Sequence, residues 1–369
     1  MRSDFPRISF APCSCGASQA SIHRRRFLSG GVGLGLAVAG TLSGCASVVP
    51  PASRRDDGLI DVHHHHIPPF YLEEYRDRIV GSRGGKINPA WLSWSPQKAI
   101  DAMDAANVST AVLSLTTPGV WFGDPVAARR TARQVNEYAA GLARIYPGRF
   151  GLFAALPLPD QDASLKEIEY ALDVLKADGI GVLTSYDDKW LGSPAYDAVF
   201  AELNRRKAVV FVHPTIALCC RTLLPDVTPL ITEIPQDTAR AISNLLFTGT
   251  FSRYRDIKFI FTHAGGNMPM MVGRMKQYGP ASLATLAPLG IEQELRRHYF
   301  DLAGTANKPA VAAITSIVPT SQILMGSDNP FIPLAETARD LQSLGLSAVD
   351  LQAIRRDNAL ALLPGAAVR

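Results

Sequence analysis

The chain has 369 residues, of which 47% are hydrophobic and 19% are charged, and its formal net charge is +4. Such a chain can bury a large globular core, which excludes a disordered or fibrous protein. The net positive charge of +4 belongs entirely to the first 45 residues, where five arginines stand against one aspartate, so we expect no basic face and no nucleic-acid partner in the rest of the chain.

The first 45 residues have the pattern of an export signal. Arg24-Arg25-Arg26-Phe27-Leu28 precedes an uncharged, glycine-rich stretch that is too short to indicate a membrane span. The adjacent arginines resemble a twin-arginine signal, and Leu42-Ser43-Gly44-Cys45 resembles a lipoprotein cleavage box in which Cys45 would be lipidated. We therefore expect an exported, periplasmic lipoprotein of a bacterium that contacts the membrane only through its lipid anchor. An exported protein that merely has a cysteine at this position is the alternative.

After a linker at residues 46–57, residues 58–369 form one expected domain in which short apolar runs alternate with longer stretches of helical period. The expected strands are Leu59 to His65, Thr110 to Leu115, Phe150 to Ala155, Ile180 to Thr184, Val209 to His213, Lys258 to Thr262, Tyr299 to Leu302 and Ile323 to Met325. The expected helices include Pro125 to Tyr146, Ala163 to Lys176, Pro194 to Arg206, Thr238 to Ser252 and Asn307 to Ile317.

Eight strand-then-helix units predict a (β/α)8 TIM barrel, an α/β fold whose active site lies at the carboxyl ends of the strands. A doubly wound open sheet is the alternative, but no glycine-rich phosphate loop follows the first strand.

Four consecutive histidines, His63 to His66, complete the first strand. Side chains alternate along a strand, so His63 and His65 project to one face while His64 and His66 project to the other, and one pair can chelate a single ion. A purification tag is the alternative explanation, but tags stand at termini or in polar linkers rather than in a strand.

Three further polar residues follow later strands: His213, His263 and Asp328. A lone histidine in such a place would be a core residue, but the ends of strands one, five, six and eight converge on one mouth of a barrel. We therefore predict one divalent metal ion. Imidazole and carboxylate ligands without a thiolate suit Zn²⁺, with Mn²⁺ as the second choice.

Four motifs carry a family resemblance. They are Ile60-Asp61-Val62-His63-His64-His65, Phe211-Val212-His213-Pro214, Thr262-His263-Ala264-Gly265-Gly266 and Met325-Gly326-Ser327-Asp328-Asn329-Pro330-Phe331. They resemble the amidohydrolase superfamily and, within it, the aminocarboxymuconate-semialdehyde decarboxylase branch with its 6-methylsalicylate decarboxylases. The resemblance covers nearly the whole chain after Gly58. It implies the metal ligands His63, His65, His213 and Asp328, with His263 beside the metal-bound water.

The resemblance also implies the reaction, a non-oxidative decarboxylation of a small aromatic acid related to 2-hydroxybenzoate. Asp328 would deliver a proton to the ring, and His263 would assist proton movement. In relatives an arginine matching Arg274 enters the site of the neighbouring subunit, so we expect a homodimer. Arg221 is a second candidate for the substrate carboxylate, although either arginine could instead form an ordinary salt bridge. Trp190 could pack against the aromatic ring or belong to the core.

Hydrolysis is the alternative function, because the same scaffold with a metal-bound hydroxide and His263 as base can cleave a lactone, ester or amide. A periplasmic binding protein without turnover is a third possibility. It would be expected to lack a metal ligand, and the expected ligands His63, His65, His213 and Asp328 are all present.

Overall fold

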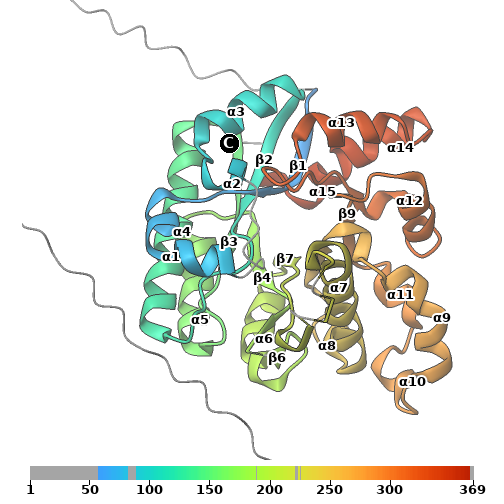
Figure 1. Ribbon diagram of the computed structural model, residues 1–369. Coiled ribbons are helices and arrows are strands. Elements are labelled where there is room, and N and C mark those ends of the chain that lie inside the picture. Colours follow the sequence, from blue (N-terminus) through green and yellow to red (C-terminus); the bar gives the residue numbers. More distant parts are fainter. Residues whose placement is uncertain (1–56, 82–88, 188, 221–222, 225, 366–369) are drawn as a thin grey trace, which may run out of the picture. The chain divides into compact units, whose positions relative to one another are not determined.

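The computed structural model describes residues 57–81, 89–187, 189–220, 223–224 and 226–365 (Figure 1). The expected export signal, the lipidation residue Cys45, nearly all of the linker and Arg221 lie outside the described residues. Within the described part of the chain, none of the helices is both long and apolar enough to span a bilayer.

The core of the domain is a sheet of eight parallel strands that follow one another in chain order. They are β1 (Leu59–His65), β2 (Val108–Ser114), β3 (Phe150–Ala155), β4 (Gly179–Leu183), β7 (Val209–His213), β8 (Lys258–Phe261), β9 (Tyr299–Asp301) and β10 (Ile323–Leu324). Each expected strand is present, with bounds that agree to within two residues. A short antiparallel pair, β5 (Ser185–Tyr186) and β6 (Lys189–Trp190), was not expected.

The last strand returns to the first and closes the sheet. Val62 N donates to Met325 O (3.0 Å), and His65 N donates to Asn329 O (2.8 Å). His64 and Asn329 also form an isolated parallel bridge. This seam confirms the (β/α)8 barrel and rules out the doubly wound open sheet, whose first and last strands do not pair.

Helices connect successive strands and surround the barrel (Figure 1). They are α1 (Pro69–Gly81), α2 (Pro89–Leu92), α3 (Pro96–Ala105), α4 (Pro125–Ile145), α5 (Gln161–Glu169), α6 (Asp197–Arg205), α7 (Pro229–Phe247), α8 (Thr250–Arg253), α9 (Met268–Tyr278), α10 (Leu283–Leu286), α11 (Ile291–Leu295), α12 (Lys308–Thr315), α13 (Leu334–Gln342), α14 (Ala348–Gln352) and α15 (Asn358–Leu362). Local signals set several starts: the Asp124 carboxylate accepts from Val126 N (2.8 Å) and Ala127 N (3.2 Å), which caps α4.

One helix differs clearly from the sequence expectation, whereas the helix expected from Ala163 to Lys176 is α5 continued by a π-helical turn at Tyr170–Val174. We expected a single helix from Thr238 to Ser252, whereas α7 already begins at Pro229 and ends before Gly249, where φ is +72°. Pro235 lies inside α7, although proline lacks an N–H group and usually ends or kinks a helix. The missing hydrogen bond would run from the backbone nitrogen of Pro235 to the carbonyl oxygen of Ile231. Ile231 lies in the exposed first turn of α7, where a water molecule can bind that oxygen.

A bulge in β1 sets the direction of the histidines. The register with β2 shifts by one residue between Asp61 and His64. As a result Val62 packs with apolar residues of the inner cluster, while the ring of His63 lies 5.1 Å from that of Phe211 in the same cluster. Bulges re-aim side chains in this way. His63 and His65 therefore share the barrel interior at its carboxyl end.

Candidate active site

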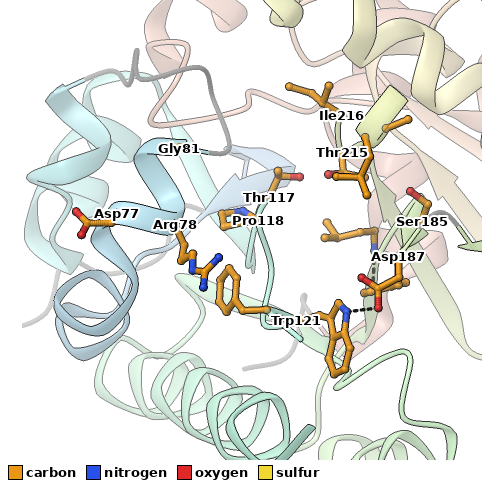
Figure 2. A pocket seen from close by; sticks show the side chains of 15 residues that line it. Asp77, Arg78, Gly81, Thr117, Pro118, Trp121, Ser185, Asp187, Thr215 and Ile216 are labelled. Carbon is orange, nitrogen blue, oxygen red and sulfur yellow. Dashed lines mark hydrogen bonds between the residues drawn. The ribbon is translucent and has the colours of Figure 1, made fainter. Parts of the chain in front are cut away.

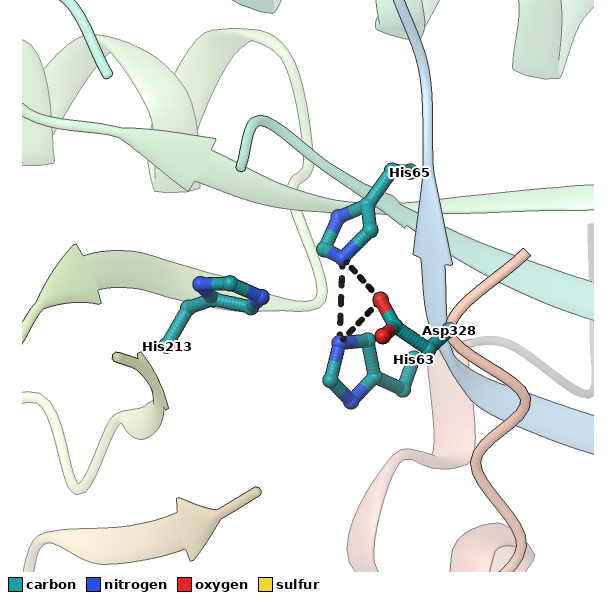
Figure 3. Close-up of side chains that lie close together, drawn as sticks. All are labelled: His63, His65, His213 and Asp328. Carbon is teal, nitrogen blue, oxygen red and sulfur yellow. Dashed lines mark hydrogen bonds and ion pairs between the residues drawn. The ribbon is translucent and has the colours of Figure 1, made fainter. Parts of the chain in front are cut away.

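Four side chains that the sequence predicted as metal ligands meet at the carboxyl end of the barrel (Figure 3). One donor atom from each of His63, His65, His213 and Asp328 lies within 4.8 Å of all the others. The Nε2 atoms of His63 and His65 are 3.0 Å apart, and Asp328 Oδ1 lies 2.9 Å from His65 Nε2 and 3.4 Å from His63 Nε2. Three imidazole nitrogens and one carboxylate oxygen without a thiolate fit a divalent cation, which confirms the predicted metal site.

Each ligand ring is held through its other nitrogen. His63 Nδ1 contacts Asp301 Oδ2 (3.0 Å), His65 Nδ1 contacts Ser114 Oγ (3.1 Å), and His213 Nδ1 donates to Pro214 O (2.8 Å). These bonds direct the three Nε2 atoms toward one another. Partners of this kind fix the tautomer and the orientation of a metal-binding histidine.

Asp301 is a site residue that the sequence analysis missed. Its Oδ2 holds His63, and its Oδ1 accepts from the backbone nitrogens of His263 (3.1 Å) and Ala303 (3.0 Å). One buried carboxylate thus orients both a metal ligand and the candidate proton-transfer residue. Asp301 ends the seventh strand of the barrel, which is the same signal that indicated the other site residues. A single aspartate after two aromatic residues has no distinctive spacing, so the sequence analysis passed over it.

A second buried carboxylate, Asp61, ties β1 to the segment that carries Asp328. Asp61 Oδ1 accepts from His63 N (3.1 Å) and Ser327 N (2.9 Å), and Oδ2 accepts from Ser327 Oγ (2.6 Å) and lies 3.0 Å from His64 Nδ1. His64 therefore faces away from the metal ligands and orients this carboxylate instead. Asp328 N in turn donates to His63 O (2.8 Å).

The two candidate catalytic residues both have left-handed backbone conformations. The φ angle is +56° at His263 and +64° at Asp328. Non-glycine residues in this region are uncommon, and they are often found at functional sites. Gly266 follows in the same turn, and a Cβ there would lie 2.0 Å from Pro235 O, so only glycine allows α7 to approach this closely.

Burial and the neighbouring charges determine which site groups are ionised. Burial, together with the rings of His65 and His63, holds the pKa of His213 well below its usual value, so His213 is neutral, as a ligand must be. Burial alone would raise the pKa of Asp328. Its interactions with His263, His63 and His65 outweigh burial and hold that pKa well below the usual carboxyl range.

His63 behaves differently from His213. Burial opposes its protonation, but Asp301 and then Asp328 outweigh burial and raise the pKa of His63 to about 10 while no cation is bound. A proton on this ring balances the two carboxylates. A metal ion would take over that balance and displace the proton.

A cavity of about 430 Å³ opens beside the metal ligands. His213, His263, Thr305 and Asp328 contribute the polar part of its lining. The apolar part comes mainly from the start of α7 and the segment after β10: Leu230, Ile231, Ile234, Phe331 and Ile332. A cavity of this size, with its polar groups gathered at one point, fits a single-ring substrate. Among the described residues that line it, none is an arginine or lysine.

The predicted substrate-binding residues are not brought to this cavity within the described chain. Arg274 lies on α9, exposed, with its guanidinium 4.9 Å from the centre of the Tyr278 ring. Trp190 lies in β6 and is half-buried, away from the cavity lining. Their contacts with substrate stay predictions, as does that of Arg221.

Asp237 is a further buried carboxylate that the sequence analysis missed. It lies on α7, and its Oδ2 accepts from Thr184 Oγ1 and from Thr215 N (3.1 Å). Thr184 N donates to His213 O (3.0 Å), so Asp237 ties α7 to the ends of β4 and β7 beside a metal ligand. Burial raises the pKa of Asp237 to about 6. In the sequence, this aspartate looks like an ordinary polar residue near the start of a helix.

Comparison with known proteins places these features in context. A family model described as amidohydrolase matches residues 60–365. The chain is 36% identical to decarboxylase yanB of Aspergillus niger, covering 83% of this chain and 87% of that protein. It is 34% identical to 6-methylsalicylic acid decarboxylase acuB of Aspergillus aculeatus, covering 83% and 96%. A solved dihydroxybenzoic acid decarboxylase from Polaromonas, with bound manganese and the inhibitor 2-nitroresorcinol, superposes with a TM-score of 0.74 at 21% identity, covering 84% and 97%.

The metal site predicts that substitution of its ligand residues, but not of the nearby His64, removes the bound ion. The mature protein should contain about one tightly bound divalent ion per chain, and the double variant His213→Ala with Asp328→Ala should lose it. His64→Ala is the matched control, because the His64 side chain contacts Asp61 and none of the four predicted metal ligands. Elemental analysis after dialysis measures the content. Full occupancy in the double variant would overturn the ligand assignment.

Asp237 predicts a stability difference that depends on pH. A folded carboxyl with a raised pKa destabilises the protein once it ionises, so wild-type stability falls as pH rises from about 4 to about 6. Asp237→Asn keeps an acceptor for Thr215 N and cannot ionise. Urea titrations measure the difference in the free energy of unfolding between Asp237→Asn and wild type. From about pH 4.5 to about pH 7.5, this difference should change by about 2 kcal/mol in favour of the variant. The exposed Asp101→Asn is the control, and a pH-independent difference for Asp237→Asn would contradict the expectation.

Proposed function

Given that the chain belongs to the amidohydrolase family, whose model matches residues 60–365, we propose that it is a metal-dependent decarboxylase of a small aromatic acid. The relatives at 34% and 36% identity are decarboxylases, which favours carboxy-lyase activity over hydrolysis of a lactone, ester or amide. The observation that carries the proposal is the junction of three groups: the buried metal ligands, the ionised Asp328, and an apolar cavity of single-ring size.

The substrate class we propose is 2-hydroxybenzoate-like. A divalent cation held by His63, His65, His213 and Asp328 would bind the carboxylate and the adjacent phenolate and withdraw electron density from the ring. We propose Zn²⁺, which three nitrogen ligands and one oxygen ligand favour, and we take Mn²⁺ as the alternative because the solved Polaromonas enzyme contains it. The apolar residues Leu230, Ile234 and Phe331 would contact the faces and edges of the ring.

Asp328 and His263 are positioned to move the proton. Asp328 Oδ1 faces His63 and His65, while Oδ2 lies 3.8 Å from His263 Nε2. Asp328 thus has one oxygen for the metal side and one for proton exchange with His263. Because Asp328 is ionised, it would first take up a proton by way of His263 and would then pass that proton to the ring carbon that bears the carboxylate. When carbon dioxide leaves, the electron pair of the broken carbon–carbon bond returns to the ring.

The cavity supports a role for a neighbouring subunit. Since no arginine or lysine lines it within the described chain, an arginine that binds the substrate carboxylate would have to be Arg221, which lies outside the described residues, or come from another subunit. Arg274 is exposed on α9, the helix that begins just after the His263 turn. We propose a homodimer in which Arg274 of each subunit binds the substrate carboxylate in the site of the other.

The location of the protein is also a proposal. The twin-arginine pattern at Arg24 to Arg26 and the cleavage box ending at Cys45 support export to the periplasm with a lipid anchor. A folded, metal-loaded enzyme suits the twin-arginine route, since that route carries proteins already folded.

Carbon dioxide release tests the reaction directly. The mature protein loaded with Zn²⁺ should release carbon dioxide from 2-hydroxybenzoates, and His263→Ala should lower kcat by about 10²- to 10⁴-fold while retaining the metal. A parallel assay measures acid release from lactones and esters. If the protein releases acid from lactones or esters but no carbon dioxide from 2-hydroxybenzoates, its function is hydrolysis and the proposed decarboxylation is wrong.

Subunit complementation tests Arg274. We expect Arg274→Ala to weaken substrate binding or turnover without loss of metal. Mixing Arg274→Ala with His263→Ala should restore part of the activity, because a hybrid dimer has one site with both residues intact. The dimers must be verified as hybrids by two different affinity tags. If activity does not recover in verified hybrids, Arg274 either acts in the active site of its own chain or only stabilises the fold.

Fractionation tests the location. Replacing Arg24, Arg25 and Arg26 by lysine should leave the precursor in the cytoplasm. Cys45→Ala should convert a membrane-associated enzyme into a soluble one with the same specific activity, since the lipid would be its only anchor. Membrane association that survives Cys45→Ala would refute lipidation at this residue, and export with the three lysines would refute the twin-arginine route.

A further inference from the structure

His298 is a buried histidine that lies outside the lining of the catalytic cavity beside the metal ligands. It directly precedes β9, so it lies at the amino end of the barrel strands, and its side chain is completely buried. Phe251, Phe259 and Phe261 contact it, with ring centroids 4.4, 5.2 and 6.1 Å from the centroid of the imidazole. These three rings, from α8 and β8, form what we call the Phe cage. The cage surrounds a polar ring with apolar surface.

Neither ring nitrogen of His298 has a hydrogen-bond partner among the described residues. Other polar rings of the barrel are held by such bonds. At the barrel mouth the Trp121 indole N–H donates to Asp187 Oδ2 (2.6 Å), as Figure 2 shows, and near the metal ligands His63 Nδ1 contacts Asp301. Because a buried polar group without a partner destabilises a fold, His298 is held in the Phe cage by packing alone.

The charges that act on His298 oppose its protonation. Arg297 directly precedes it, Lys258 lies on β8, and Arg255 lies between α8 and β8. Glu294 of α11 is buried nearby in the chain, but it is already paired with Arg297 (2.8 Å) and Arg255 (3.4 Å). Burial, together with the three cations, holds the pKa of His298 well below its usual value. His298 is therefore neutral while it occupies the Phe cage.

The strand that follows His298 has little backbone pairing of its own. β9 has three residues, which form two residue pairs with β8 and two with β10. Its last residue is Asp301, which contacts His63 Nδ1 and accepts from the backbone nitrogen of His263. A displacement at His298 would therefore be transmitted along a three-residue strand to the carboxylate that orients a metal ligand.

We infer that His298 is a pH-sensitive switch: its neutral ring keeps the start of β9 packed in the barrel, and its protonation releases that segment. A proton on the caged ring would add a cation beside Arg297, Lys258 and Arg255 without a free carboxylate to pair with it, so the protonated ring leaves the Phe cage for water. The start of β9 opens with it, and Asp301 loses its fixed position. The switch goes beyond the proposed function, because it needs neither substrate nor turnover.

The direction of the pH dependence follows from where the proton binds. In the opened segment the His298 ring meets water, where the pKa of an imidazole is about 6.5. In the Phe cage the pKa of the same ring is well below that value. Between the two pKa values the open state binds one proton more than the closed state. The equilibrium constant for opening should therefore rise by up to about tenfold for each pH unit below about pH 6, and it should be constant above about pH 7.5.

Hydrogen exchange of the metal-loaded, full mature chain measures this opening. From about pH 6 to about pH 5, the protection factors of the β9 amides, corrected for intrinsic exchange rates, should fall by about five- to tenfold in the wild type. In His298→Leu, whose side chain cannot ionise, they should change by less than about twofold. The amides of β3, which does not pair with β9, are the internal reference and should keep their protection in both proteins.

Two further variants separate protonation from packing. His298→Asn is neutral at every pH, so it should match His298→Leu, and it gives the same comparison if the leucine variant does not fold. Phe251→Leu loosens the Phe cage but keeps the imidazole, so β9 should be less protected at every pH and should still lose protection below about pH 6. The switch is wrong if wild type and both His298 variants lose equal protection in β9, or if β3 loses as much protection as β9.

Discussion

The structure depends above all on how the barrel closes between its first and last strands. β10 has only two residues, so backbone pairing alone offers little to hold this seam. The Asp61 carboxylate supplies the rest, because it accepts bonds from both sides of the seam at His63 and Ser327. The metal ligands His65 and Asp328 lie just beyond these residues. Together with the backbone bonds across the seam, this buried, hydrogen-bonded carboxylate brings His65 and Asp328, more than 260 residues apart in the chain, into contact.

The sequence predicted most of what depends on periodicity. Strand bounds were correct to within two residues, because every strand is a short apolar run bounded by turns or polar residues. Polar residues at the ends of apolar strands indicated the candidate metal ligands His213 and Asp328, and the family resemblance selected the pair His63 and His65 from the histidine run. These four side chains do meet in the structure. Alternation along β1 also separated the two histidine pairs correctly, although the bulge that accommodates Val62 left no trace in the sequence.

What the sequence could not provide is the partner of each polar residue. Asp301 and Asp237 have no special spacing, and their roles arise from contacts with residues far away in the chain. The start of α7 was missed for a different reason. Pro235 is a local signal for a helix end, but its environment in the fold overrides that signal. Tertiary contacts are thus the part of the site that single-residue patterns do not encode.

The two halves of the catalytic cavity differ in how strongly they are constrained. The metal side is built from buried residues with several bonds each, and even its backbone is fixed at His263 and Asp328. The opposite wall includes Leu230 and Ile231, whose side chains are 45% and 68% exposed and have room to change. Substitutions there would reshape the cavity at little cost in stability. Descendants of such a protein could therefore acquire new acids as substrates by drift in the first turn of α7, while the inherited chemistry of the metal side remained unchanged.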